Sequence, residues 1–445
     1  MGGVAALARA AGHRVTGSDS NVYPPMSTQL ERAGIALTEG WDPAQLVPEP
    51  DYVVIGNALS RGNPVVEAVL DRGLRYTSGP EWLARHVLDG RHVLAVSGTH
   101  GKTTTASMLA FILADAGIDA GYLIGGIPAN FGESARYGDS DFFVVEADEY
   151  DTAFFDKRAK FVHYRPRTLV MNNLEYDHAD IYRDIEAIVW QFHQLLRTVP
   201  ASGRVVINAR DANLRKVLDA GCWTPVESFA AAGEGDWRAE FLDRRERRLA
   251  IRSPDGERAE TEWLSGGMHN LENAAAAVAA AASAGVALAD AVAALGRFRG
   301  VKRRLERTAV VGDVEIYDDF ALHPTAIRRT LEALRKRQPE GRIVVALEPR
   351  SNTMKLGVHN RALAPSLAGA DLVCVYRPAG FDAGFDGCLA GLGARLRLYD
   401  DYDALARGLA ELVAAGDRLV FMSNGGFGGV RERVTATLDA ARPGG

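Results

Sequence analysis

The feature that most constrains this chain is the segment 93–105, VLAVSGTHGKTTT, in which an apolar run of strand length meets a glycine-rich turn. Lys102 and Thr103 follow the turn and lead into an apolar-periodic segment, ASMLAFILADAG. Strand, glycine-rich loop, lysine and helix together bind phosphate, because backbone N–H groups, the helix N-terminus and the lysine all favour an anion. The sequence therefore predicts a phosphate-binding loop, with Thr103 available to hold Mg²⁺.

The loop departs from the usual spacing G-x-x-x-x-G-K-[ST]. Val96 stands where the first glycine belongs, and the glycine is Gly98, two residues later. The loop is therefore a shortened variant and does not by itself indicate a particular class of NTPase. An ordinary strand-to-helix turn is the alternative. That alternative is the weaker one, because the segment has two glycines, a preceding apolar run and three consecutive threonines.

Composition narrows the class of protein. A chain of 445 residues has room for two to four domains. The net charge of −6 argues against a nucleic acid held by bulk charge. The three cysteines, Cys222, Cys374 and Cys388, have no CxxC spacing, which is typical of a reduced, cytoplasmic protein. No apolar run is long enough to span a bilayer and no signal peptide is recognisable, so we expect no membrane partner.

Alternating strand and helix patterns predict an α/β fold with three domains. We expect a Rossmann-like domain over residues 1–89, a central α/β domain with the phosphate-binding loop over 90–297 and a second Rossmann-like domain over 298–445. The chain opens on a helix pattern, MGGVAALARAAG, so the strand and glycine turn that normally begin a nucleotide-binding βαβ unit are expected to be missing. Between residues 203 and 264, short strands with polar turns predict solvated β-structure.

Acidic residues follow two apolar strand patterns beyond the loop. Glu146 ends the run DFFVVE, and an acid at a strand end near a phosphate loop is a common Mg²⁺ partner. A solvated acidic loop is the alternative, and it carries more weight for Asp148, Glu149 and Asp151 than for Glu146. His178 ends the second run, TLVMNNLEYDH, beside two carboxylates, which favours a metal ligand but leaves a structural role open.

Two asparagines stand at the start of a very alanine-rich helix pattern, NLENAAAAVAAAA. Asn270 and Asn273 lie one turn apart on one helix face. Helix N-capping is one interpretation, which explains one asparagine well and two less well. A ligand-binding role for the pair is the other interpretation. Near the end of the chain, GGFGG is glycine-rich like a phosphate or carboxylate loop, which is a weak signal on its own.

In this order, the segments resemble the Mur ligase family, whose members form amide bonds in peptidoglycan precursors. The resemblance covers nearly the whole chain and rests on GTHGKTTT (98–105), EADEYD (146–151), NNLEYDH (172–178), MHNLENA (268–274), RR (303–304) and YDDF…HP (317–324). Further segments resemble the branch of the family that acts on murein peptides: SDSNVYPPMSTQLE (18–31), IGNALSRGNP (55–64), FFDKRAKFVHY (154–164), LEPRSNTMK (347–355) and MSNGGFGG (422–429).

The resemblance implies an activity and its small-molecule partners. The expected enzyme joins the free tripeptide L-alanyl-γ-D-glutamyl-meso-diaminopimelate to UDP-N-acetylmuramate in peptidoglycan recycling. It would use ATP with Mg²⁺ and pass through an acyl phosphate. The resemblance implies that residues 1–89 bind the UDP-sugar, residues 90–297 bind ATP and residues 298–445 form a further ligand-binding domain. An L-alanine-adding sister ligase and a non-catalytic nucleotide-binding homologue are the alternatives.

The resemblance also implies roles for particular residues. Lys102 would hold the β- and γ-phosphates of ATP, Thr103 and Glu146 the first Mg²⁺, and His178 a second. Arg304 would reach the phosphates from beyond the domain boundary and, with Lys102, Glu146 and His178, would make up the catalytic set. The loop residues expected to contact ATP are Gly98, Thr99, His100, Gly101, Lys102, Thr103 and Thr104.

The remaining contacts would come from later in the chain. Asn270 and Asn273 would contact the adenine, and Asp319 the ribose. The acidic tripeptide needs a cation, for which Arg350 and Lys355 are the candidates.

The sequence departs from the family pattern at two further places. Leu322 stands where the family usually has a histidine, so only His323 remains as a candidate substrate contact there. No lysine occurs between Lys160 and Lys216, so the carboxylated lysine of several sister ligases is not expected.

Overall fold

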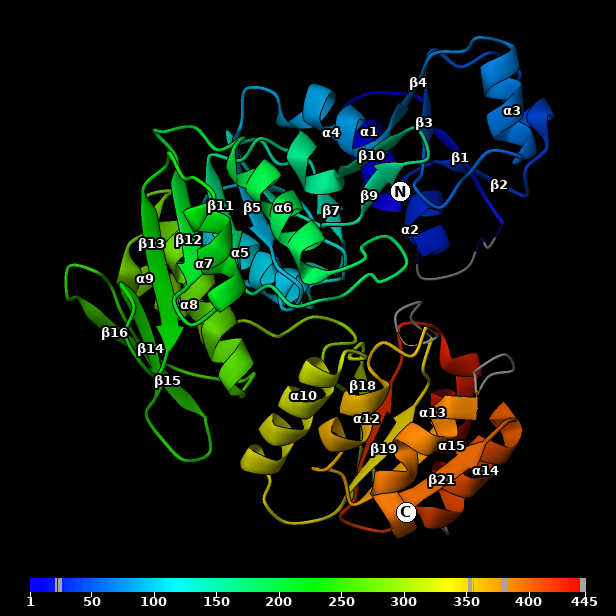
Figure 1. Ribbon diagram of the computed structural model, residues 1–445, viewed down its shortest axis with the longest axis vertical. Helices are drawn as coiled ribbons and strands as arrows, with labels where there is room; N and C mark the ends of the chain where they lie inside the picture. The colour runs from blue at the N-terminus through cyan, green and yellow to red at the C-terminus, as the bar shows by residue number, and fades with distance from the viewer. Residues whose placement is uncertain (21, 23–25, 351–353, 355, 378–382, 441–445) are drawn as a thin grey trace.

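The computed structural model describes residues 1–20, 22, 26–350, 354, 356–377 and 383–440. These residues form three units that follow one another along the chain, coloured from blue to red in Figure 1. Within the described ranges, no helix combines the length and apolarity that a bilayer crossing requires. The three-domain α/β fold predicted from the sequence is confirmed. The domain boundaries after residues 89 and 297 stay predictions.

The N-terminal unit, residues 1–88, holds two separate parallel strand pairs, β1–β2 and β3–β4. Its small core is formed by Leu46, Ile55 and the apolar face of α3. The elements are α1 (Gly2–Ala10), β1 (Thr16–Asp19), α2 (Met26–Arg32), β2 (Ala36–Glu39), β3 (Val53–Ile55), α3 (Pro64–Asp71), β4 (Tyr76–Ser78) and α4 (Gly79–Leu83).

The central unit, residues 92–295, is built on a ten-stranded sheet of order β16-β15-β14-β13-β12-β11-β5-β8-β6-β7. The run from β6 to β14 is parallel, and β7, β15 and β16 are antiparallel additions at the two edges. The strands of the sheet are β5 (His92–Ser97), β6 (Gly121–Leu123), β7 (Ala135–Arg136), β8 (Phe142–Glu146), β11 (Thr168–Met171), β12 (Arg204–Asn208), β13 (Val226–Ala231), β14 (Trp237–Phe241), β15 (Arg248–Arg252) and β16 (Arg258–Glu262).

Helices cover both faces of the central sheet, as expected for buried parallel strands. The alanine-rich helix α8 is buried along Ala274–Ala281, and its small side chains allow it to pack beside α5. A short hairpin of β9 (Asp151–Ala153) and β10 (Asp156–Ala159) follows β8. The helices are α5 (Lys102–Asp115), α6 (Ile185–Leu196), α7 (Ala212–Asp219), α8 (Met268–Ala282) and α9 (Leu288–Leu295).

The expectation of solvated β-structure over residues 203–264 is only partly right. The strands exist, but α7 interrupts them, and Trp237, Leu249 and Ile251 are buried. These strands continue the main sheet, so one of their faces packs under α8. The polar residues that dominate the segment occupy the other face and the turns, which is why composition alone suggested full solvation.

The C-terminal unit, residues 306–440, is a six-stranded sheet of order β17-β18-β22-β19-β20-β21 between helices. Within this sheet only β17 is antiparallel to its neighbour. Helix α10 contacts α8 of the central unit. The elements are β17 (Glu306–Val311), β18 (Val314–Asp319), α10 (Pro324–Arg337), β19 (Ile343–Leu347), α12 (Asn360–Ser366), β20 (Leu372–Tyr376), α13 (Ala383–Leu389), β21 (Leu396–Tyr399), α14 (Tyr402–Leu412), β22 (Arg418–Met422) and α15 (Val430–Ala440).

Candidate active site

The glycine-rich loop joins β5 to α5, as the sequence predicted. Gly98 and Gly101 have φ angles of 135° and 80°, which favour glycine. A Cβ at Gly98 would lie 3.0 Å from the Cβ of Asn172, and one at Gly101 would lie 2.4 Å from Oδ1 of Asn273. Both glycines are therefore required by conformation and by close packing. They leave the N-terminus of α5 open toward a cavity.

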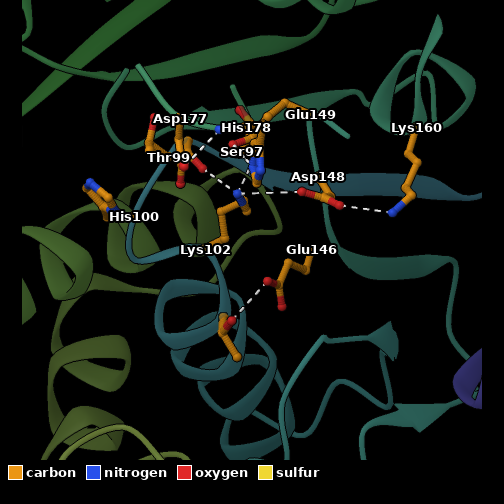
Figure 2. Close-up of polar contacts among 12 residues, drawn as sticks. Ser97, Thr99, His100, Lys102, Glu146, Asp148, Glu149, Lys160, Asp177 and His178 are labelled. Carbon is orange, nitrogen blue, oxygen red and sulfur yellow. Dashed lines mark hydrogen bonds and ion pairs between the residues drawn. The ribbon is translucent and has the colours of Figure 1, made fainter. Parts of the chain in front are cut away.

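Lys102, the first residue of α5, lies in a buried ion network (Figure 2). Its Nζ donates to the carbonyl oxygen of Gly98 at 2.7 Å and to Oε2 of Glu149 at 2.7 Å, and lies 3.8 Å from Oδ1 of Asp148. Burial opposes the positive charge, but the two carboxylates outweigh it and raise the pKa of Lys102. The lysine is therefore charged and held at the loop.

The alternative of a solvated acidic loop after β8 is wrong for Glu149. Its side chain pairs with Lys102, and the residue is only 1% exposed. Asp148 accepts from Lys160 at 3.0 Å, so it links two lysines. Burial opposes ionisation of Asp148, but Lys102 and Lys160 lower its pKa to about 2. Sequence reasoning missed both as site residues; the one available signal was their position directly after a buried strand.

Thr103, Glu146 and Arg304 meet on the other side of the loop. The Thr103 hydroxyl donates to Oε1 of Glu146 at 2.9 Å and accepts from Nη2 of Arg304 at 3.0 Å. The second oxygen of Glu146 accepts from the Gly125 amide at 2.6 Å. Arg304 follows the central unit in the chain, and the structure brings it to the loop as predicted. The roles of these residues in binding metal and phosphate stay predictions.

His178 lies in a different cluster from Thr103 and Glu146. Its Nε2 is 3.3 Å from Oε1 of Glu149, and one ligand atom each of His178, Asp148 and Glu149 lies within 4.8 Å of the others. Burial disfavours the imidazolium, but the bond to Glu149 raises the pKa of His178. His178 with Asp148 and Glu149 therefore forms a group of candidate metal ligands separate from Thr103 and Glu146.

The two asparagines at the start of α8 do not cap the helix. The N-cap is Gly267, and no side chain makes the capping hydrogen bond. Instead Asn273 donates to Oδ1 of Asn270 at 3.3 Å, and Asn270 donates to the carbonyl oxygen of Gly266 at 2.9 Å. The capping interpretation is wrong, and Oδ1 of Asn273 faces Gly101 of the loop.

Asp319 ends β18 and is nearly fully buried. Its Oδ1 accepts from the Ala321 amide at 3.1 Å and its Oδ2 from the Thr330 hydroxyl at 2.8 Å. Burial raises the pKa of Asp319, although these bonds oppose the rise. Leu322, the departure from the family pattern, packs into the apolar core of the C-terminal unit.

Arg350 follows β19 and lies over the glycine-rich turn that precedes α15. Its Nη1 is 3.9 Å from Oε1 of the buried Glu348, and a Cβ at Gly425 would lie 2.4 Å from the same nitrogen. Lys355 lies outside the described residues. His323 caps α10, where its Nδ1 accepts from the Thr325 amide at 3.2 Å.

Two cavities meet at the loop. The first, of about 1200 Å³, lies between the central and C-terminal units, and the second, of about 1010 Å³, is lined by all three units. Thr103, Glu146, Asp148 and Arg304 line both cavities. The predicted site residues that line the first are Thr99, His100, Gly101, Lys102, Thr103, Thr104, Glu146, His178, Asn270, Asn273, Arg304, Asp319, His323 and Arg350.

Comparison with known proteins gives the same division into three parts. Residues 1–91 match the model of the Mur ligase family, catalytic domain; residues 96–281 match the Mur ligase middle domain; and residues 303–425 match the Mur ligase, glutamate ligase domain.

Three relatives are similar over nearly their whole lengths. The UDP-N-acetylmuramate–L-alanyl-γ-D-glutamyl-meso-2,6-diaminoheptandioate ligase of Escherichia coli is 51% identical, with 98% of this chain and 95% of the relative covered. The protein of the same name from Haemophilus influenzae is 48% identical, with 98% and 96% covered. The crystal structure of a murein peptide ligase from Psychrobacter arcticus is 44% identical, covers 100% of this chain and 97% of its own, and has a TM-score of 0.78. This chain belongs to the Mur ligase family.

Proposed function

We propose that this protein is an ATP-dependent ligase that joins the free tripeptide L-alanyl-γ-D-glutamyl-meso-diaminopimelate to UDP-N-acetylmuramate, as a step in peptidoglycan recycling. The observation that carries the proposal is the meeting of two cavities at Thr103, Glu146 and Arg304. A phosphoryl group can pass from a donor in one cavity to an acceptor in the other only where the two adjoin. The substrates are those for which the relatives from Escherichia coli and Haemophilus influenzae are named.

The first cavity suits ATP. Lys102 and the N-terminus of α5 supply positive potential for the phosphates. Asn270 and Asn273 offer amide groups for the adenine at the same cavity. Asp319 can serve the ribose because each carboxylate oxygen has a second lone pair besides the one already bonded.

The donor atoms at the loop fit Mg²⁺. Thr103 and Glu146 place hydroxyl and carboxylate oxygens side by side, which are the ligands that Mg²⁺ prefers. His178, with Asp148 and Glu149, forms the second candidate group. Bound Mg²⁺ would neutralise charge on the transferring phosphoryl group.

The second cavity suits the UDP-sugar. The N-terminal unit lines it with Gly2, Gly3, Asn57 and Gly79, and the loop side contributes Glu146. Small residues and a side-chain amide leave space and hydrogen-bonding groups for a large polar substrate. The muramyl carboxylate would extend from there toward Thr103 and Arg304.

In the proposed reaction, the muramyl carboxylate oxygen attacks the γ-phosphorus of ATP, the bond to the β–γ bridging oxygen breaks, and ADP leaves. The neutral amine of the tripeptide then attacks the acyl phosphate carbonyl, and phosphate leaves from the tetrahedral intermediate as the amine gives up one proton. In these two reaction steps the residues at the loop position the reacting groups and stabilise their charge. Neither step needs a covalent protein nucleophile.

Phosphate release with defined substrates tests the proposal. We expect release only when ATP, UDP-N-acetylmuramate and the tripeptide are all present, and we expect Lys102→Ala to abolish it because the charge at the transferring phosphoryl group is lost. Turnover with L-alanine that the tripeptide does not improve would identify the sister activity instead. ATP binding without phosphate release in any mixture would identify a non-catalytic homologue.

A further inference from the structure

Two adjacent arginines at the boundary between the central and C-terminal units reach different sites. Nη2 of Arg304 donates to the Thr103 hydroxyl at 3.0 Å, at the phosphate loop. Arg303 instead contacts the turn 423–429, SNGGFGG, which we call the SNGGFGG turn. Its Nη2 donates to the carbonyl oxygens of Ser423 at 2.8 Å and of Gly425 at 2.7 Å. Consecutive residues therefore send one guanidinium to the phosphate loop and the other to the SNGGFGG turn.

The Arg303 guanidinium is committed to the C-terminal unit. Besides its two bonds to the turn, its Nε lies 3.3 Å from Oδ2 of Asp318, a buried carboxylate that also pairs with Arg431. By contrast, the Arg304 guanidinium forms no ion pair with any residue that the structure describes, and its printed donor bond goes to a neutral hydroxyl. The charge of Arg304 is therefore available to a phosphate, whereas that of Arg303 is already compensated.

The backbone around the two arginines has little freedom. The φ angles are 61° at Arg303 and 48° at Leu305, so both neighbours of Arg304 lie in the left-handed region that L-residues rarely occupy. The Arg303 carbonyl oxygen accepts from the Phe320 amide at 2.8 Å, and the Arg303 amide donates to Oε2 of Glu306 at 2.8 Å. Such conformations persist only where the surrounding contacts determine them, so a displacement of Arg303 also displaces Arg304.

The SNGGFGG turn packs against Arg350, the candidate peptide contact. A Cβ at Gly425 would lie 2.4 Å from Nη1 of Arg350, so the glycine and the guanidinium are in close contact. The Ser423 hydroxyl donates to the buried carboxylate of Glu348 and accepts from the Gly425 amide at 2.9 Å. The same carboxylate lies 3.9 Å from Nη1 of Arg350. A ligand that orders Arg350 therefore orders the turn as well.

We propose that Arg303 is a positioning residue that couples the peptide site at Arg350 to Arg304 at the phosphate loop. The inference rests on the proposed function, with Arg350 as the contact of the tripeptide and ATP at the loop. Peptide binding orders the SNGGFGG turn, the turn holds the Arg303 guanidinium, and the left-handed segment then fixes Arg304 beside the transferring phosphoryl group. Coupling of two binding sites is reciprocal, so the tripeptide tightens nucleotide binding and the nucleotide tightens tripeptide binding.

Calorimetry with a non-hydrolysable ATP analogue tests the coupling, with UDP-N-acetylmuramate present throughout. We expect the tripeptide to tighten binding of the analogue to the unmodified protein by about 5- to 150-fold, the usual range for coupled sites. An affinity that the tripeptide leaves unchanged in the unmodified protein would overturn the inference. This first measurement needs no variant and therefore does not depend on whether a variant folds.

Two variants then locate the coupling. Arg303→Met removes the donors to the turn and keeps a long unbranched side chain, so the effect of the tripeptide should fall to less than about twofold while the analogue alone binds as before. Arg431→Met is the matched control, because Arg431 pairs with the same oxygen of Asp318 but its printed side-chain bonds go to Asp318 and Glu432 and not to the turn. It should keep the full effect. Unchanged coupling in Arg303→Met, or an equal loss in Arg431→Met, would overturn the assignment to Arg303.

Phosphate release separates this inference from the proposed function. If the unmodified protein releases phosphate with ATP, UDP-N-acetylmuramate and the tripeptide but shows no coupling, the inference about Arg303 alone fails. If it releases phosphate in no mixture of these substrates, the proposed function fails and the inference fails with it.

Discussion

Gly101 offers a sharp test of how the phosphate loop packs. Gly101 precedes α5 and Gly117 follows it, and both have a φ of 80°. Alanine in this left-handed region costs roughly 1–2 kcal/mol at either position. The two sites differ in their surroundings, because a Cβ at Gly101 would lie 2.4 Å from Oδ1 of Asn273, whereas one at Gly117 meets nothing within 4 Å. Gly117→Ala is therefore a matched control for Gly101→Ala.

The difference between the two variants measures the contact with Asn273. This side chain is buried and bonds to Asn270 and Asn172. Displacing a buried amide from its partners costs about 1–3 kcal/mol. At about 1.4 kcal/mol per factor of ten, Gly101→Ala should lower the local stability about 5- to 150-fold more than Gly117→Ala does.

Hydrogen exchange read by mass spectrometry gives the local stability. We expect Gly101→Ala to lower protection in peptides from the start of α8, where Asn273 lies, and Gly117→Ala to lower it only near the end of α5. Calorimetry with a non-hydrolysable ATP analogue should show weaker binding for Gly101→Ala alone. Equal protection at α8 and equal affinity in the two variants would refute the reasoning.

Two further predictions concern charged groups. The folded-state pKa of Asp148, about 2, lies below its usual 3.8, so its ionised form stabilises the fold above about pH 4 and this contribution is lost as the pH falls toward 2. The melting temperature of Asp148→Asn should therefore fall below that of the unmodified protein near about pH 6, and the gap should close by about pH 2; a gap independent of pH would contradict this. Gly425→Ala should displace Arg350 and raise KM for the tripeptide about 10- to 100-fold, the range for a lost charged hydrogen bond. Gly426→Ala, where a Cβ meets nothing within 4 Å, is the control, and equal KM values would exclude Arg350 as a peptide contact.

Much of the fold was predictable because its signals are local. The strand, glycine turn and helix at residues 93–105 depend on apolar periodicity and on glycine conformations, which neighbouring residues determine. The alternation of strands and helices predicted three α/β domains for the same reason. Between residues 203 and 264, the polar composition suggested full solvation because the strands there carry one buried and one solvated face.

The charge partners were not predictable. The acidic run after β8 suggested solvent exposure for Glu149, yet this residue is buried against Lys102, 47 positions earlier. The two amides at the start of α8 were ambiguous until their hydrogen bonds excluded capping. His359 carried no signal at all, and it meets His323 only through packing within the C-terminal unit.

The sequence by itself determined a phosphate loop and the three-domain α/β plan, because these follow from short-range periodicity, conformation and side-chain type, and its resemblance to the Mur ligase family implied the class of chemistry. Only the tertiary structure decided that Glu149 neutralises Lys102, that Arg304 reaches Thr103 and that two cavities adjoin at the loop. Those pairings join residues far apart in the chain. Their energies depend on burial and on distances of a few ångströms, which exist only after the three units have packed together.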